Sequence, residues 1–119
     1  MSDLWPTELK VSDHGRILKI TFDNGAEHQI PAELLRVESP SAEVKGHGPG
    51  QEQLVFGKRL VSITKIDPVG SYAARINFSD GHSTGLYTWA YLEKLGREQG
   101  HMWTDYLEKL KTEGKTREP

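Results

Sequence analysis

The chain has 119 residues and a mass of 13.4 kDa, which fits one compact domain. It contains no cysteine, which excludes disulfides, thiolate zinc sites, iron–sulfur ligation and a cysteine nucleophile. Fifteen Lys and Arg residues against seventeen Asp and Glu residues give a formal net charge of -2, so no basic field points to nucleic acid or to an anionic membrane.

Nothing in the sequence is typical of a membrane or targeting segment. No apolar run approaches the roughly 20 residues needed to cross a bilayer. The start of the chain, Met1–Pro6, lacks both a basic region and an apolar region. We therefore expect a cytoplasmic protein that lies in no membrane, and the absence of cysteine is compatible with a reducing compartment.

The first third of the chain predicts antiparallel hairpins and a short helix. Apolar and polar residues alternate over Leu9–Val11 and Ile17–Phe22, with turn-forming residues between the two runs. Asn24-Gly25 is typical of a type I′ turn, in which both central residues take positive φ. We expect the return strand over Ala26–Ile30 and then a helix over Pro31–Arg36, because proline suits a first helical position.

A polar segment separates this part from a second set of strands. Glu38–Gln53 contains many Gly, Ser and Pro residues and predicts a loop of about 15 residues. Alternating runs then predict strands over 60–66, 72–78 and 83–87, with turns at 68–70 and 79–82. Thr88 is expected to cap a helix that continues through Leu95.

The two halves of the chain resemble each other. A shift of 56 positions places Lys19–Gly25 on Arg75–Gly81, and each segment precedes a predicted helix. Either two copies of one strand–turn–strand–helix unit pack together, or two common glycine turns arose independently. The predicted fold class is α+β: small antiparallel β-hairpins with short helices in two similar units, followed by a C-terminal helix.

Residues after Gly96 predict an amphipathic C-terminal helix. Its apolar residues recur at spacings of three and four over Glu98–Leu110. They are Met102, Trp103, Tyr106, Leu107 and Leu110. The helix either covers the sheet or binds a partner. We divide the chain into a domain over 1–95 and a helix with its tail over 96–119, and we expect the charged tail 111–119 to be frayed.

No catalytic motif is present. The five histidines lie outside His-x-Asp and His-x-Glu frames, and no His-Glu-x-x-His occurs. The glycine-rich Gly46–Gly50 lacks the Lys-Ser/Thr pair of a phosphate-binding loop, and no Gly-x-Ser-x-Gly occurs. Lys58-Arg59 and the basic residues near the C-terminus alternate with acids, which argues against nucleic-acid binding. We expect no enzyme activity.

Two segments carry a family resemblance. Leu34–Val44 and Ile76–Leu92, which contains Asp-Gly-His, resemble the N-terminal domain of gamma-butyrobetaine and trimethyllysine hydroxylases, also called domain of unknown function 971. The resemblance covers Leu9–Leu95. It implies a small α+β accessory domain of the stand-alone bacterial type, without the oxygenase domain that carries the hydroxylase activity.

The resemblance also implies a zinc site that this chain has lost. In the hydroxylases, three cysteines and one histidine hold a structural zinc. The matching positions here are Ser39, Ser41, Val44 and His82. Because serine is a poor zinc ligand and valine is none, we expect no metal at this degenerate site. Relatives of the domain are fused to iron–sulfur cluster assembly proteins, which suggests a role near metalloenzymes.

Two functional hypotheses follow. The first is a non-catalytic accessory or adaptor domain without a cofactor. It would bind a protein partner through the aromatic residues Tyr87, Trp89, Tyr91, Trp103 and Tyr106. The alternative is a module that binds Zn or Fe and is associated with oxidoreductases. It would use His82 together with His47, Glu38 or Glu43 of the long loop.

Overall fold

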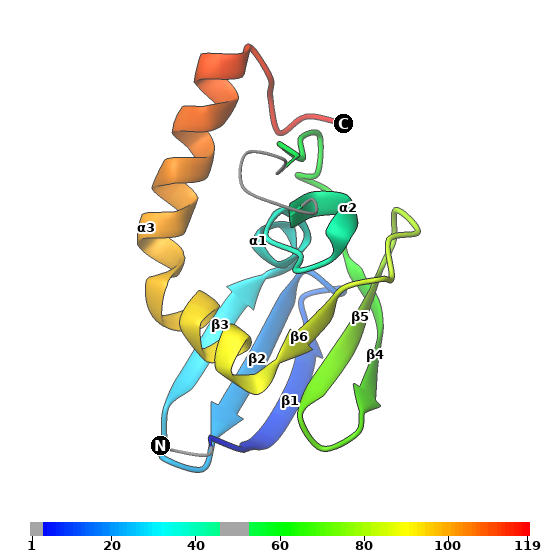
Figure 1. The fold of residues 1–119 in the computed structure, drawn as a ribbon, viewed down its shortest axis with the longest axis vertical. Coiled ribbons are helices and arrows are strands. Elements are labelled where there is room, and N and C mark those ends of the chain that lie inside the picture. The colour runs from blue at the N-terminus through cyan, green and yellow to red at the C-terminus, as the bar shows by residue number, and fades with distance from the viewer. Residues whose placement is uncertain (1–3, 46–52) are drawn as a thin grey trace.

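The computed structural model describes residues 4–45 and 53–119, and it confirms the predicted α+β fold. Two three-stranded antiparallel sheets and one long helix enclose the core, and the long helix lies along one side of the molecule (Figure 1). The elements are β1 (Pro6–Ser12), β2 (Ile17–Phe22), β3 (Glu27–Pro31), α1 (Ala32–Val37), α2 (Ala42–Lys45), β4 (Ile63–Val69), β5 (Ala73–Phe78), β6 (Leu86–Thr88) and α3 (Trp89–Glu113). The helix α2 interrupts the segment that the sequence predicted as loop.

The two sheets have the same topology. Their strand orders are β1-β2-β3 and β4-β5-β6, and each sheet is followed directly by a helix. The central strand β2 alternates strictly, with Leu18, Ile20 and Phe22 buried, because one face of the sheet packs on the core. The prediction of two similar units is confirmed.

The glycine turns of the two units also match each other, but they are not type I′. Phe22 N–H donates to Ala26 O (2.8 Å) and Gly25 N–H to Phe22 O (3.0 Å). Among these turn residues only Gly25 has positive φ (88°), so the turn is type I followed by a glycine bulge. The predicted positive φ at Asn24 is wrong. Its side chain instead accepts a hydrogen bond from Ala26 N–H (2.9 Å).

Strand boundaries in the second sheet differ from the prediction. Pro68 and Val69 belong to β4 and pair with Ala74 and Ala73, so the turn begins at Gly70 (φ 56°). A proline is tolerated there because β4 is an edge strand. The strand predicted over 83–87 is shorter and is displaced to Leu86–Thr88.

Both units contribute to one core. Side chains from the sheets, α1 and α3 pack together. The fully buried ones with the largest volumes are Leu18, Ile20, Phe22, Ile30, Leu34, Leu35, Ile76, Tyr87, Leu92 and Leu95. Since α3 contacts β3 as well as β6, the helix of the second unit also covers the sheet of the first.

The long helix passes through Gly96 without a break. A Cβ atom at Gly96 would overlap the ring of His28 on β3, so the glycine serves close packing of the helix on the sheet. The predicted end of a helix at this glycine is wrong, and the proposed division between 95 and 96 falls inside α3. The predicted cap is confirmed, because Thr88 Oγ1 accepts a hydrogen bond from Tyr91 N–H (3.1 Å).

The segment after α3 is held against the rest of the protein. Gly114 ends the helix in the left-handed conformation (φ 67°), and the chain then turns back (Figure 1). Gly57 N–H donates to Thr116 O (3.0 Å) and Arg59 N–H to Arg117 O (2.9 Å). The prediction of a frayed tail is therefore wrong, because backbone and side-chain partners outside the helix order it.

No helix in the described residues is long and apolar enough to cross a membrane.

Candidate functional site

The four positions of the degenerate zinc site are all buried. Ser39 and Ser41 lie between α1 and α2, Val44 lies on α2, and His82 lies between β5 and β6. Ser39 is fully buried and His82 is 7% exposed. The turn after β5 thus brings His82 to two serines that lie about forty residues earlier in the chain.

The two serines and the histidine form a triangle of hydrogen-bonding atoms. His82 Nε2 lies 3.0 Å from Ser39 Oγ and 3.3 Å from Ser41 Oγ, and the two hydroxyl oxygens are 3.2 Å apart. Ser41 N–H also donates to Ser39 Oγ (3.4 Å). We call Ser39, Ser41 and His82 the Ser–His cluster. It joins the connection between the helices to the hairpin of the second sheet.

The Ser–His cluster does not fit a zinc ion. Zinc sites in proteins use thiolate, imidazole and carboxylate ligands, and this site offers one imidazole, two neutral hydroxyls and the aliphatic Val44. His82 Nε2, the nitrogen that faces the serines, lies within hydrogen-bonding distance of both hydroxyls. The site is built as a hydrogen-bonded joint.

The alternative metal ligands are not brought together in the part of the chain that is described. Within it, no group of three or more His, Asp or Glu residues converges to hold a metal ion. The Glu38 carboxylate is paired with Lys45 (3.0 Å). His47 and the Glu43 side chain lie outside the described residues.

Close packing surrounds the Ser–His cluster. A Cβ atom at Gly85 would lie 2.5 Å from Ser39 Oγ, so only glycine allows this approach. Tyr87 donates a hydrogen bond to Leu35 O, and its burial raises the pKa of the phenol. The cluster is therefore enclosed by fixed groups, and Ser39 is inaccessible as a nucleophile.

A charged network lies beside the cluster. Asp80 Oδ2 accepts hydrogen bonds from Arg36 Nε (2.7 Å) and Lys58 Nζ (2.6 Å), and Asp80 Oδ1 accepts one from His82 N–H (3.0 Å). Burial alone would raise the pKa of Asp80, but the hydrogen bonds from Lys58, His82 and Arg36 lower it to about 2. The sequence indicated only an Asp-Gly turn here, because nothing local reveals that distant cations reach Asp80.

The five aromatic residues predicted to bind a partner do not form one surface. Tyr87 and Tyr106 are buried in the core, so the prediction of an exposed aromatic cluster is wrong for these two. Tyr106 donates a hydrogen bond to Val55 O (2.7 Å), and burial raises its pKa to about 12. The other three are half-buried, and Trp103 lies at a distance from Trp89 along α3.

Trp89 instead belongs to a different exposed surface. Its backbone N–H donates to Tyr72 O (3.3 Å) and its indole Nε1 donates to Ser71 O (3.0 Å). Tyr72 is 54% exposed and Leu86 is half-exposed on the neighbouring edge strand. We call Tyr72, Leu86 and Trp89 the aromatic face.

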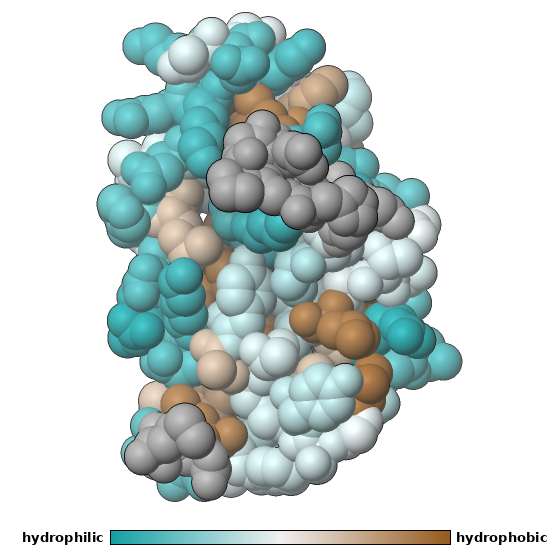
Figure 2. Space-filling view, in the orientation of Figure 1, coloured by the Kyte–Doolittle hydropathy of each residue, from teal (hydrophilic) through white to brown (hydrophobic). Residues whose placement is uncertain are grey.

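Few charged residues border the aromatic face. No Lys, Arg, Asp or Glu occurs over 81–92, and Arg75, which pairs with Leu86, is the charged neighbour in the sheet register. Figure 2 shows pale surface with brown, hydrophobic patches in the region where β5, β6 and the start of α3 lie in Figure 1.

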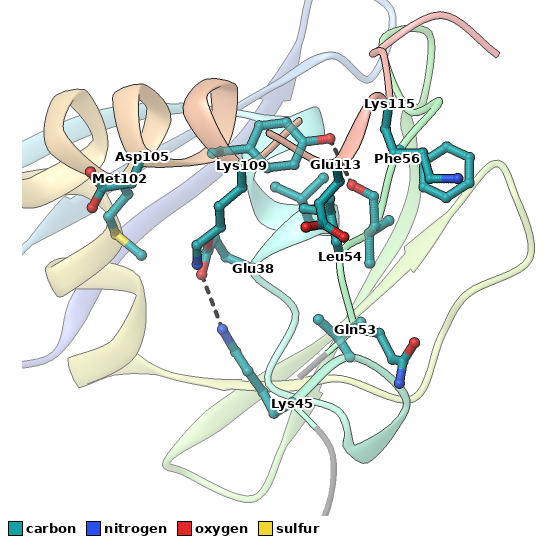
Figure 3. A pocket seen from close by; sticks show the side chains of 14 residues that line it. Glu38, Lys45, Gln53, Leu54, Phe56, Met102, Asp105, Lys109, Glu113 and Lys115 are labelled. Carbon is teal, nitrogen blue, oxygen red and sulfur yellow. Dashed lines mark hydrogen bonds and ion pairs between the residues drawn. The ribbon is translucent and has the colours of Figure 1, made fainter. Parts of the chain in front are cut away.

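A groove of about 740 Å³ lies between α2, residues 53–56 and the second half of α3 (Figure 3). Its lining includes Val37, Val44, Leu54, Val55, Met102 and Tyr106, with charged side chains around them. Glu38, Lys45, Asp105, Lys109, Glu113 and Lys115 carry those charges, and both signs are represented. The sequence did not predict this groove, because its walls come from three separate segments.

Comparisons with known proteins agree with this fold. A family model described as gamma-butyrobetaine hydroxylase-like, N-terminal, matches residues 9–93. Two proteins with NMR solution structures are similar: one is 47% identical (100% of this chain, 89% of its own, TM-score 0.85) and the other 39% identical (98%, 91%, TM-score 0.84).

A third similar protein is one of unknown function from Acidithiobacillus ferrooxidans, in the family of domain of unknown function 971. Its sequence is 37% identical to this chain. The match to its crystal structure covers 76% of this chain and 91% of the other, with a TM-score of 0.64. No curated protein matches the chain.

Proposed function

Since this chain belongs to the gamma-butyrobetaine hydroxylase-like N-terminal family, we propose that it is a non-catalytic accessory domain that binds a protein partner. The observation that supports this most is the aromatic face, an exposed Tyr and a fixed Trp on a surface with few charges. Trp, Tyr and Arg are the residues most enriched among the energetic centres of protein interfaces.

The aromatic face is pre-organised for binding. Trp89 is held at its backbone N–H and at its indole N–H, both by the turn between β4 and β5. A side chain that is already fixed loses little conformational entropy when a partner docks on it. Arg75 at the border lies between Leu86 and Asp67 in the sheet register, so charges of both signs border the apolar side chains.

The Ser–His cluster supports the absence of catalysis in this proposal. Its hydroxyls are buried and its imidazole is within hydrogen-bonding distance of them, so it offers no open position for a substrate or a metal-bound water. The metal-binding alternative keeps only His82 and Glu38 among the described side chains, and each already has a partner. On the resemblance alone, we place the partner among metalloenzymes or iron–sulfur assembly proteins.

Site-specific crosslinking tests this proposal. A photoreactive phenylalanine analogue at Tyr72 should crosslink one partner in cells, and the same analogue at Leu107, which is 40% exposed on α3, is the matched control. With that partner purified, Tyr72→Ala and Trp89→Ala should each raise the Kd about tenfold or more, and Leu107→Ala should leave it unchanged. Equal crosslinking from both positions, or an unchanged Kd in both aromatic variants, would contradict the proposal.

A further inference from the structure

A buried carboxylate on α1 is paired with the segment that follows α3. The side chain of Glu33 is 7% exposed, and its two oxygens accept hydrogen bonds from Arg117 Nε (2.9 Å) and Nη2 (2.7 Å). Such a parallel pair of hydrogen bonds is the strongest geometry between a carboxylate and a guanidinium. Glu33 therefore selects a planar cation, and here the cation comes from 84 residues later in the chain.

An aromatic ring completes the environment of this cation. The guanidinium carbon of Arg117 lies 5.0 Å from the centre of the Trp103 ring, within the range of a cation–π interaction. A cavity of about 350 Å³ opens beside the pair and is lined by Pro31, Glu33, Leu34 and Trp103 among others. A buried carboxylate, an aromatic wall and open volume are the parts of a receptor for a guanidinium group.

The segment that delivers Arg117 is attached at the surface. Among the described residues, its contacts include the two backbone hydrogen bonds from Gly57 and Arg59, the bond from Lys115 N–H to Leu110 O (2.8 Å), Lys115 over the ring of Phe56 (4.8 Å) and the exposed pair of Arg59 with Glu118. Exposed ion pairs contribute little to stability. Gly114, in the left-handed conformation, caps α3 and joins the segment to it.

We propose that Glu33 and Trp103 form an arginine-binding site, that Arg117 is its resident ligand, and that an arginine-bearing segment of another protein takes its place. Main-chain contacts accompany the arginine, because Gly57 and Arg59 donate hydrogen bonds to the carbonyls of Thr116 and Arg117. This inference goes beyond the proposed function, because the site shares no residue with the aromatic face.

The affinity of the resident segment determines how tightly an incoming segment must bind to displace it. A short tether holds its arginine at an effective concentration of about millimolar. An incoming segment must therefore bind with more contacts than the resident one, and the open cavity beside Arg117 supplies room for them. Removing the resident arginine should unmask the site for weak probes.

Chemical rescue of Arg117→Ala is the first test. The variant should lose about 8 °C in Tm, because it leaves the Glu33 carboxylate buried without a cation. Millimolar ethylguanidinium should restore at least half of this loss, and ethylammonium should restore less because it lacks the planar fork. The double variant Glu33→Gln/Arg117→Ala should show no rescue. Arg59→Ala, which loses only the exposed ion pair, is the matched control.

Competition is the second test, and it uses the folded wild-type chain as well. A labelled peptide with the sequence Gly-Lys-Thr-Arg-Glu-Pro of residues 114–119 should bind Arg117→Ala about tenfold or more tighter than wild type. Arg117→Lys, which keeps a cation beside Glu33, replaces the alanine variant if that variant does not fold. Equal affinity for both proteins, or equal rescue with Glu33→Gln, would overturn the proposal.

Discussion

The two glycine turns of this protein begin from the same local structure and end with different roles. In the first unit Asn24 Oδ1 accepts a hydrogen bond from Ala26 N–H (2.9 Å), and in the second Asp80 Oδ1 accepts one from His82 N–H (3.0 Å). Gly25 and Gly81 have nearly the same φ, 88° and 92°. The two turns therefore have the same local backbone structure and the same side-chain hydrogen bond.

What differs is the chemistry of the side chains that the turn presents. Asp80 in place of Asn24 carries a charge that collects Arg36 and Lys58, and His82 in place of Ala26 reaches the two serines. The first turn remains a surface hairpin, and the second turn is hydrogen-bonded to the connection between α1 and α2.

The helices that follow the two sheets differ as well, because α3 packs through Gly96 on the sheet of the first unit. A substitution at Gly96 is expected to change stability the most. Gly96→Ala should lower the free energy of unfolding by about 3 kcal/mol, because the new methyl would meet the His28 ring near its attachment to β3. Gly100→Ala is the control in the same helix, where a Cβ meets nothing within 4 Å and should stabilise by about 1 kcal/mol. Urea unfolding measures both, and equal effects would contradict close packing at Gly96.

Substitution of His82 tests whether the Ser–His cluster makes the second turn more important for stability than the first. His82→Ala should cost about 2 kcal/mol, because Ser39 and Ser41 stay buried and lose a hydrogen-bonding partner. His101→Ala, at an exposed position on α3, should change stability by less than about 0.5 kcal/mol. A similar small effect for both variants in urea unfolding would show that the Ser–His cluster is not a structural joint.

The charge of Asp80 makes the contribution of the second turn to stability depend on pH. Its pKa of about 2 in the folded protein lies below the ordinary value of 3.8, so it stabilises the fold above about pH 4 and this contribution is lost as the pH falls toward 2. We expect about 1–2 kcal/mol from a side chain that is 19% exposed. Asp80→Asn keeps the turn hydrogen bond and should remove this part of the acid dependence. Unfolding curves measured between pH 5 and 2 should then differ between the two proteins, and parallel curves would refute the assignment.

The smallest expected effect is at the first turn. Asn24→Ala should cost about 1 kcal/mol, the value of one exposed turn hydrogen bond. Asn24→Asp should be close to neutral and should not create the acid dependence of Asp80, because no Lys or Arg in the described part of the chain pairs with the Asn24 side chain, which accepts the turn hydrogen bond. Thermal unfolding of both variants at two pH values checks this, and a marked acid dependence in Asn24→Asp would contradict it.

Much of the fold follows from local patterns in the sequence. Alternation over Ile17–Phe22 identified a strand with one buried face, Thr88 identified a helix start, and the 56-residue repeat identified two similar units. The first two signals depend on residues that are close in the chain, and the repeat compares two stretches of the sequence, so all three can be evaluated without knowing the fold. The family resemblance, carried by Leu34–Val44 and Ile76–Leu92, is a sequence property of the same kind.

Only the tertiary structure decided which of these residues meet. The sequence predicts a helix end at Gly96, because glycine is the poorest local helix former after proline, yet α3 continues through Gly96 and packs closely on His28 there. Tyrosine is common in binding surfaces, but Tyr87 and Tyr106 are buried in the core. The pairing of Glu33 with Arg117 joins α1 to the last residues of the chain, and no local pattern records a contact made across 84 residues. Local sequence patterns predict most helices and strands and the family of the chain. The contacts between distant residues follow from the tertiary structure, because burial and charge pairing depend on distance in space.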